Sequence, residues 1–373
     1  MNKMDVYLTW MTKEQASDLY LAAGRPPIIK VQGKHVYYGD KLLSPEEILE
    51  MALEICSEEQ KKEFLSTHEL NLAYSVKGYG RFRVNFYQQR GTVAVVARYV
   101  RHEIPTVRDL GLPNTLNEIS LLKQGLVLIT GPTGSGKTTT LAAMVDYRNS
   151  NSVGHIITIE DPIEFVHRHK KSIVTQREVG IDTESFIEAL RNVVRQAPDV
   201  VLIGEMRDVE SVQAAIHFAE TGHLVLATLH ANTTEQALER ILNFYPTSGA
   251  EQVLVQLSIE LAAIIGLRLV QRADGTGRCA AYEIMLATPR IREIIERGQL
   301  GEIKTTVAAS TAEGCITFDQ CLYDLYKRDV ITEQEALRWA DSANNLRLKI
   351  KMEKTAATGT PDSAARLRLT RTD

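Results

Sequence analysis

The residues best suited to chemistry lie in a glycine-rich segment, 131–138, that reads Gly-Pro-Thr-Gly-Ser-Gly-Lys-Thr. It matches the P-loop pattern G-x-x-x-x-G-K-T, in which backbone N–H groups surround phosphates, the lysine contacts the β- and γ-phosphates and the threonine hydroxyl binds Mg²⁺. An apolar run at 127–130 precedes the loop and a helix-forming run at 137–147 follows it, which makes an ordinary glycine-rich turn the weaker alternative. We expect ATP and Mg²⁺ to bind here. The predicted nucleotide-binding residues are Gly131, Pro132, Thr133, Gly134, Ser135, Gly136, Lys137, Thr138 and Thr139.

A carboxylate follows a second apolar run. Residues 200–203 read Val-Val-Leu-Ile, and Glu205 comes two positions later. The carboxyl ends of parallel strands face the ligand crevice of an open α/β sheet. Glu205 could there orient or deprotonate the water that attacks the γ-phosphate, or hold Mg²⁺ through water. The alternative is an acid at a helix start, since Asp208 follows closely.

Three acids cluster after a third apolar run, 155–159. Glu160, Asp161 and Glu164 repel one another unless a cation shares their site, and a metal-bound nucleotide supplies one. We therefore expect Glu160, with Thr138, to lie near Mg²⁺. Taken alone, Asp161 before a proline also suits the start of a turn.

Two histidines flank a fourth run, 224–229. His223 precedes it, and His230 follows it at the carboxyl end, where it could sense the γ-phosphate. A lone histidine is more often a structural donor, so the residue types alone favour that alternative.

Two arginines lie in a strand-like segment near the N-terminus. Arg81 and Arg83 alternate with Phe82 and Val84, which puts the two arginines on one strand face and the apolar residues on the other. Basic side chains on such a face are usually solvated. They could instead reach a nucleotide across a domain or subunit boundary, as arginine fingers do.

The bulk composition limits the classes of protein that fit. A length of 373 residues predicts two or more domains, and 44% hydrophobic with 24% charged residues is typical of a globular protein. The net charge of −4 gives no electrostatic case for nucleic-acid binding. Four scattered cysteines form no C-x-x-C pair, which argues against a zinc site. No signal core or membrane-length apolar stretch is evident, so we expect a cytoplasmic protein.

The elements that would position these residues change character along the chain. Residues 1–104 predict an α+β domain with a helix over 13–23, a hairpin over 28–38, helices starting at 45 and 58, and three strands over 70–77, 81–88 and 92–101. A linker or hinge is expected over 105–122. Strands alternate with helices from 123, as in a doubly wound RecA-like core that ends at 352 and turns mostly helical after about 247. We expect a disordered tail over 353–373.

Four sequence blocks together resemble the secretion-type ATPases, and more narrowly the type IV pilus retraction motors PilT and PilU. They are GPTGSGKT, TIEDPIEF, RQAPDVVLIGEMRD and ETGHLVLATLHA, in this order. The resemblance extends from about residue 17 to residue 352. It implies an α/β fold with a RecA-like ATPase domain, a smaller PAS-like N-terminal domain, and a homo-hexameric ring at the inner-membrane base of the pilus. It also implies a pilus platform protein as partner.

Residue roles follow from the matching positions. The resemblance implies that 131–138 is the Walker A loop and that Glu205 ends an atypical Walker B strand. Glu160, Asp161 and Glu164 match the Asp box, His223 and His230 the His box, and Arg81 with Arg83 the arginine-bearing N-terminal strand. We expect Glu164 to be the most important acid of its box.

Several departures favour the PilU type. PilT-like chains carry an acid where this chain has Ala197, and they differ over 288–296, whereas 317–320 and 342–351 look PilU-like. The chain could therefore retract pili itself, or act as a nucleotide-regulated coupling subunit of a PilT-type ATPase. A nucleic-acid motor on the same core is disfavoured by the charge balance.

Overall fold

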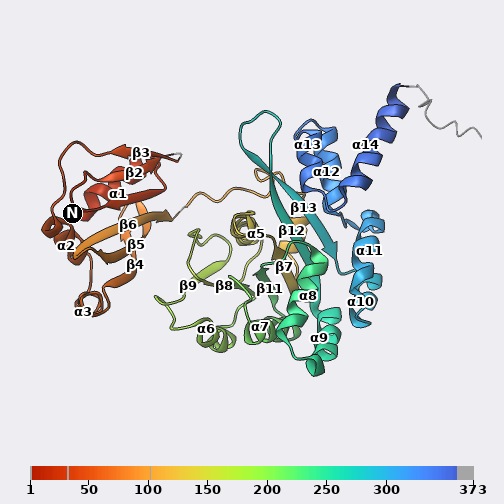
Figure 1. Cartoon of the computed structure of the whole chain (residues 1–373). Coiled ribbons are helices and arrows are strands. Elements are labelled where there is room, and N and C mark those ends of the chain that lie inside the picture. Colours follow the sequence, from red (N-terminus) through yellow and green to blue (C-terminus); the bar gives the residue numbers. More distant parts are fainter. Residues whose placement is uncertain (1, 32, 101, 359–373) are drawn as a thin grey trace, which may run out of the picture. The chain divides into compact units, whose positions relative to one another are not determined.

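The computed structural model describes residues 2–31, 33–100 and 102–358 (Figure 1). The density of internal contacts divides the chain into two compact units. The first unit comprises Met1–Ile104, Ile159–His169 and Val174–Ala189, and the second comprises Pro105–Thr158, Lys170–Ile173 and Leu190–Asp373.

The N-terminal part of the first unit is an antiparallel sheet with three helices. Its sheet has the order β3-β2-β1-β6-β5-β4. Its elements are α1 (Lys3–Lys13), β1 (Asp18–Leu21), β2 (Ile28–Val31), β3 (Lys34–Tyr37), α2 (Pro45–Glu54), α3 (Glu58–Thr67), β4 (Glu69–Val76), β5 (Gly80–Gln89) and β6 (Thr92–Val100). The hairpin, the two helices after Ser44 and Ser57, and the three-strand meander are confirmed.

Strand β5 shows why this sheet forms. Phe82, Val84 and Phe86 are fully buried, whereas Arg81 and Arg83 on the opposite face are partly exposed. The alternation places one apolar face against the helices, where Met4, Leu8, Ile48 and Phe64 complete the core. The predicted division of β5 into an apolar and a basic face is confirmed.

The helix predicted over 13–23 is wrong. The helix α1 ends at Lys13, Gln15 takes a left-handed conformation with φ 53°, and β1 follows. Because β1 pairs with both β2 and β6, Leu19 and Leu21 are buried at the centre of the sheet. Tertiary strand pairing overrides the local helical pattern here.

The remaining elements build a seven-stranded sheet with helices. Its order is β13-β12-β7-β11-β10-β8-β9. The strands are β7 (Gly125–Thr130), β8 (His155–Glu160), β9 (Ile173–Glu178), β10 (Val200–Ile203), β11 (Leu224–Leu229), β12 (Leu261–Gln271) and β13 (Arg278–Leu286). The helices are α4 (Thr115–Ser120), α5 (Lys137–Asn151), α6 (Phe186–Val193), α7 (Val209–Glu220), α8 (Thr234–Phe244), α9 (Thr247–Glu260), α10 (Pro289–Glu296), α11 (Ile303–Ala309), α12 (Phe318–Lys327), α13 (Glu333–Trp339) and α14 (Ala343–Thr358). Short 3₁₀ turns lie at Val194–Gln196, Leu300–Glu302 and Thr311–Glu313.

The centre of this sheet is parallel and continuously apolar. Strand β11 lies between β7 and β10, parallel to both, and every residue of the three strands is buried. Continuous apolar runs are typical of strands covered on both faces. The α/β, RecA-like core is therefore confirmed, as are the predicted strands 127–130, 155–159, 200–203 and 224–229.

The hairpin β12–β13 is a correction to the helical region expected after 247. Strand β12 pairs in parallel with β7 and antiparallel with β13, so it is covered on both edges. Its burial on both faces gives no two-residue alternation from which to recognise a strand. The Asp274-Gly275 turn between two apolar runs was the available hairpin signal.

The linker expected over 105–122 is in its second half a packed helix. Leu116 and Ile119 of α4 are buried against the core. Arg148 of α5 donates from Nη1 to the carbonyls of Ser120 (2.9 Å) and Leu122 (2.6 Å), and burial lowers its pKa. A cation on these helix-terminal carbonyls holds α4 in place.

The tail expected to be disordered from 353 begins as a helix. Helix α14 continues to Thr358, and its Glu353 and Lys354 pair with Lys327 of α12 and Glu333 of α13. The rest of that prediction, 359–373, lies outside the described residues. Within the described part of the chain, no helix is long and apolar enough to cross a membrane.

Replacing Arg292 with alanine should lower the melting temperature by about 5 °C, because a loss of ~2 kcal/mol has this effect in a domain of this size. Its guanidinium donates to the carbonyls of Ser258 and Ile259 in the last turn of α9, and to those of Leu261 (2.9 Å) and Ala287 (3.0 Å). Thermal unfolding followed by circular dichroism measures the shift.

The matched control is Arg290→Ala on the same helix. Arg290 is half-exposed and pairs with Glu293 and Glu302 at the surface, so its loss should change the melting temperature by less than about 1 °C. Equal effects of the two variants would contradict a capping role for Arg292.

Candidate functional site

The glycine-rich loop lies between β7 and α5. Gly131, the first residue after β7, has φ 149°, and a Cβ there would lie 2.4 Å from Ser135 Oγ and 2.5 Å from the carbonyl oxygen of Leu267. Only glycine fits this close approach to the neighbouring strand β12. Gly136 is also left-handed, with φ 96°, and is the N-cap of α5. The loop therefore brings successive N–H groups to the positive end of a helix, the geometry that binds phosphate.

Lys137 is buried at the first position of α5. Its Nζ donates to the carbonyls of Gly131 (2.8 Å) and Pro132 (3.1 Å) and lies 3.4 Å from His230 Nδ1. Burial lowers the pKa of this ammonium group, and the negative charge of Glu205 opposes the shift. The ammonium group of Lys137 is thus held inside the loop, where phosphate oxygens can replace its contacts with the two carbonyls.

Glu205 and His230 meet beside Lys137. Glu205 Oε1 lies 3.1 Å from His230 Nε2, and Glu205 Oε2 accepts a 2.7 Å bond from Arg207 Nε. An ammonium group can only donate, so His230 Nδ1 must accept from Lys137, which leaves Nε2–H to donate to Glu205. The His230 ring therefore bridges the loop lysine and the carboxylate.

Neighbouring strands hold these side chains together. Strands β10 and β11 run parallel in register, with Ile203 beside Ala227, so Glu205 and His230 follow adjacent strand ends. Thr228 Oγ1 donates to the carbonyl of Gly204, and the Met206 N–H donates to that of Thr228 (2.9 Å). These bonds continue the pairing past the end of β10 and fix the backbone on both sides of Glu205.

Two buried hydroxyls at the loop fit a phosphate ligand. Among the described residues, Thr130 Oγ1 and Ser135 Oγ have no hydrogen-bond partner. Buried polar atoms are normally paired, so such atoms mark a place where a ligand can donate or accept. Thr138, the second residue of α5, is exposed, as a hydroxyl that binds Mg²⁺ requires. Pro132, Thr133 and Gly134 are exposed in the same loop.

The three predicted acids Glu160, Asp161 and Glu164 lie at the end of β8 and just after it. Glu160 ends β8 and accepts a 3.1 Å bond from Gln176 within the first unit, whereas Asp161 and Glu164 are exposed. Across the described ranges, no group of three or more His, Cys, Asp or Glu side chains is placed to hold a metal ion. The roles of Glu160, Asp161 and Glu164 stay predictions.

His223 lies away from this cluster. It precedes β11, whereas His230 follows it. The six residues of β11 therefore place the two histidines roughly 20 Å apart along the strand. His223 Nδ1 lies 3.0 Å from the Phe218 carbonyl, and its ring contacts the Phe218 ring edge-on. The structure thus brings only one of the two predicted histidines to Lys137 and Glu205.

The two arginines of β5 stay in the first unit. Arg81 Nη2 lies 3.4 Å from Glu178 Oε2, and burial raises the pKa of Glu178 while both arginine charges oppose this shift. Arg83 lies opposite Arg98 in the sheet. Their role as arginine fingers stays a prediction.

Arg207 was missed by the sequence analysis. It lies two residues after Glu205, within the block RQAPDVVLIGEMRD, and its ion pair holds the second oxygen of that carboxylate. The pattern Glu-x-Arg-Asp ahead of a helix was the available signal, because a basic residue so close to a predicted catalytic acid can pair with it.

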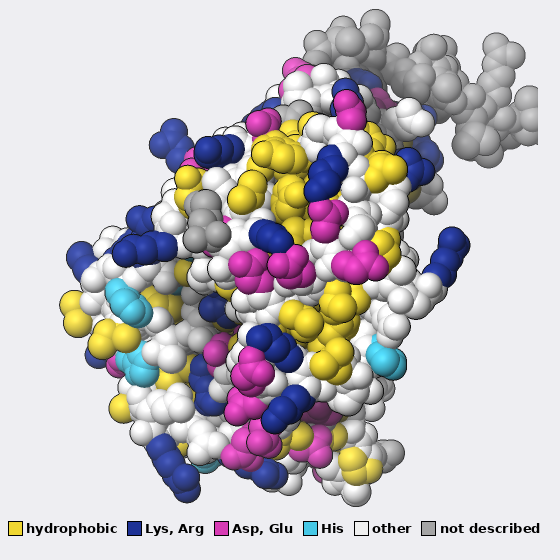
Figure 2. Space-filling view, turned by 90° about the vertical axis from the view of Figure 1, so that its left-hand side faces the viewer, with side chains coloured by type: hydrophobic (Ala, Val, Ile, Leu, Met, Phe, Trp, Pro, Cys, Tyr) yellow, Lys and Arg dark blue, Asp and Glu magenta, His cyan; other side chains and the backbone are white. Residues whose placement is uncertain are grey.

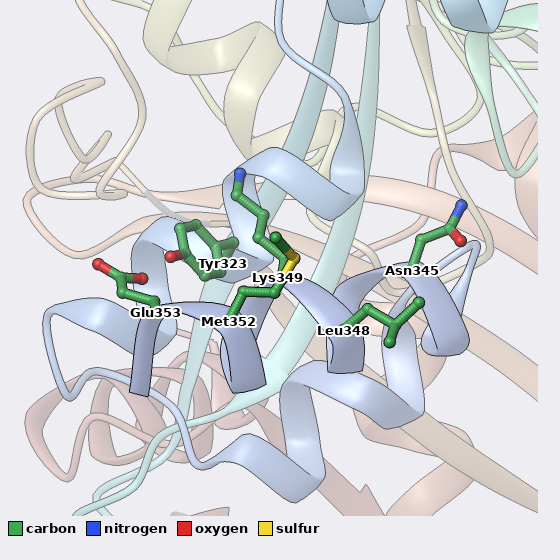
Figure 3. Close-up of a pocket in the computed structure, with 6 residues that line it drawn as sticks. All are labelled: Tyr323, Asn345, Leu348, Lys349, Met352 and Glu353. Atoms are coloured by element: carbon green, nitrogen blue, oxygen red, sulfur yellow. The ribbon is translucent and has the colours of Figure 1, made fainter. Parts of the chain in front are cut away.

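The surface has two other features relevant to binding. Basic and acidic side chains are interspersed on the face shown in Figure 2. An open groove of about 590 Å³ lies along α14 and contains none of the predicted site residues (Figure 3). The groove is lined by Tyr323, Asn345, Leu348, Lys349, Met352 and Glu353.

Comparisons with known proteins identify a family and several similar chains. Residues 81–355 match the family described as type II/IV secretion system protein. The chain is 50% identical to the type IV pilus ATPase PilU of Pseudomonas aeruginosa, over 92% of this chain and 90% of that protein. It is 39% identical to PilT of the same organism, over 91% of this chain and 98% of that protein. A crystal structure of the pilus retraction motor PilT with bound ADP superposes with a TM-score of 0.86 at 40% identity, over 93% of this chain and 99% of that one.

Proposed function

Because this chain belongs to the type II/IV secretion system protein family, we propose that it is an ATPase that powers type IV pilus retraction. The observation that carries the proposal is the contact series from Lys137 through His230 to Glu205. It joins the phosphate-binding loop after β7 to a carboxylate after β10, through a histidine after the intervening strand β11, and such a link is what coupling nucleotide binding to hydrolysis needs.

Each residue of the series has a distinct part in hydrolysis. Lys137 exchanges its carbonyl contacts for the β- and γ-phosphate oxygens of ATP, and the hydroxyl of Thr138 would hold Mg²⁺. Mg²⁺ when bound would neutralise charge on the phosphates. Glu205 orients the attacking water. His230 loses its contact with Lys137 and senses whether the γ-phosphate is present. The loop residues supply N–H donors, and Thr139 lies beside them on α5.

The remaining predicted residues complete the proposal. Glu160, with Asp161 and Glu164, would lie near the metal-bound nucleotide, and Glu164 is the acid we expect to matter most. Arg81 or Arg83 would stabilise the phosphate charge from across a boundary in a homo-hexamer. His223 would act through the α7–β11 turn that it holds. The domain division at 104 and 123 is part of this proposal.

The cellular setting follows from the same relatives. The proposed partners are other copies of this chain, a PilT-type ATPase and the inner-membrane platform protein of the pilus. The proposed location is the cytoplasmic side of the inner membrane. Neither zinc nor nucleic acid has a place in the proposal, and salt-sensitive DNA binding would contradict it.

A second function deserves a test, because identity is higher to PilU than to PilT, at 50% against 39%. The chain could be a coupling subunit whose own turnover matters little beside a PilT-type motor. Pilus retraction in cells lacking the native gene distinguishes the two, with wild type or Glu205→Ala supplied in trans and with or without the PilT-type ATPase.

If the chain is a motor, Glu205→Ala should abolish its contribution in both backgrounds. If Glu205→Ala matches wild type whenever the PilT-type ATPase is present, the coupling function is correct and the motor function is not. A wild-type chain that changes retraction in neither background would contradict both.

A further inference from the structure

The loop that follows His230 is held by buried polar side chains of a distant hairpin. Residues 230–233 join β11 to α8. Glu283 of β13, which is 2% exposed, accepts from the Thr234 N–H at 2.8 Å. Arg268 of β12 donates from Nη2 to the Asn232 carbonyl at 3.2 Å. Both contacts fall within four residues of His230, so the hairpin sets the path of the backbone that carries it.

Arg268 also binds the C-terminal helices. Its Nη1 donates to the Trp339 carbonyl at the end of α13 (2.7 Å), and its Nη2 lies 2.7 Å from Asp341 Oδ1. Only 11% of each of these two charged side chains is exposed. A planar fork with donors in fixed directions can contact all three oxygens at once, whereas a lysine ammonium is a single point.

The hairpin is shaped to hold this guanidinium. Gly266 and Glu283 are opposite one another, and Arg268, two positions along β12, is on the same face. The ring of Phe318 in α12 lies against both: Arg268 is 3.7 Å above its centre, and a Cβ on Gly266 would lie 3.0 Å from its Cζ. The missing side chain at Gly266 therefore leaves room for the stacked pair.

The junction between α13 and α14 is itself fixed. Asp319 of α12 accepts from the N–H groups of Asp341 (2.7 Å) and Ser342 (3.1 Å), and Lys304 of α11 lies 3.0 Å from Asp341 Oδ2. Figure 1 shows α12 and α13 beside the hairpin. A displacement of these helices therefore moves Asp341 and, through it, the guanidinium.

We propose that Arg268 is a positioning residue that couples the C-terminal helices α12–α14 to the loop carrying His230. The inference rests on the proposed ATPase function for its catalytic consequence, but not for the coupling itself. With Arg268 bound to Asp341, the Asn232 carbonyl is fixed and His230 stays aligned with Lys137 and Glu205. Without the contact between Arg268 and Asp341, the loop is no longer linked to the helices, and His230 is no longer aligned with Lys137 and Glu205.

The test compares Arg268→Lys and Asp341→Asn with Arg272→Lys as the matched control. Arg272 lies just after the same strand, its guanidinium pairs with Asp274, and its side chain is more exposed than that of Arg268. Three quantities are measured on the full chain. They are hydrogen exchange of the nucleotide-free protein, the melting temperature, and kcat with KM for ATP.

We expect Arg268→Lys to raise amide exchange over 231–236 about tenfold and leave β7 and β11 unchanged. It should lower kcat about tenfold with KM within about twofold, because Arg268 contacts no loop residue that binds phosphate. Asp341→Asn should give a smaller change of the same kind, and Arg272→Lys none.

Unchanged exchange over 231–236 would overturn the coupling, and increased exchange with an unchanged kcat would overturn its effect on the alignment of His230. A general rise in exchange across the sheet with a lower melting temperature would show that Arg268 only stabilises the fold. A wild-type protein without ATP hydrolysis would contradict the proposed function instead. The exchange data would then still decide whether Arg268 couples the helices to the loop.

Discussion

Replacing Lys137 with alanine is expected to lower ATP hydrolysis by about 10³-fold. Its ammonium group is buried in the loop, 2.8 Å from the carbonyl of Gly131, so it is already in place for the phosphates. A preorganised charge needs no rearrangement as negative charge develops on the γ-phosphate, and for this reason its loss costs so much. Phosphate release by the purified protein at saturating ATP measures the effect.

Lys123→Ala is the matched control, since this lysine precedes β7, outside the loop, and is exposed. It should leave turnover within about twofold of wild type. The Lys137 variant should also bind ATP more weakly, because it loses a ground-state contact as well. Normal turnover by Lys137→Ala in a folded protein would contradict the assignment of this loop as the hydrolytic site.

The sequence predicted most of this site because its residues follow strands. The parallel core is assembled from short, continuously apolar runs, and the next polar residue after each is placed at one edge of the sheet. Lys137, Glu205 and His230 could thus be expected together before the fold was known. That His223 lies at the opposite end of β11 also follows from its position ahead of the same strand.

What the sequence did not predict depends on contacts far apart in the chain. Strand β12 is buried on both faces and lies between β7 and β13, so nothing in its local pattern separated it from a buried helix. Strand β1 looked helical until its pairing with β2 and β6 was known. Arg268 was missed for the same reason: its importance lies in a contact with Asp341, more than 70 positions later.

The order of contacts in the site gives Glu205 a part separate from nucleotide binding. It reaches Lys137 through the ring of His230. Its negative charge opposes the lowering of the Lys137 pKa by burial. In the proposed reaction, ATP binding would replace the lysine's partners with phosphate oxygens, which would free His230 and leave Glu205 beside the position of the attacking water. The carboxylate should therefore matter for the chemical step more than for affinity.

Replacing Glu205 with glutamine is accordingly expected to lower kcat by about 10²- to 10³-fold while the affinity for ATP stays within about threefold. Glutamine keeps the size of the side chain and can still accept from Arg207 or His230, but it cannot take a proton or attract the developing positive charge of the water. Single-turnover hydrolysis and equilibrium binding of ATP, measured on the same purified protein, separate the two effects.

The control is Glu210→Gln in the first turn of α7. Glu210 is exposed, and the substitution removes the same charge five residues away from Glu205, so it should change neither the rate nor the affinity. If Glu205→Gln instead weakened binding and left the single-turnover rate unchanged, Glu205 would be a binding residue, and the water would have to be oriented by another acid, of which Glu164 is the first to test.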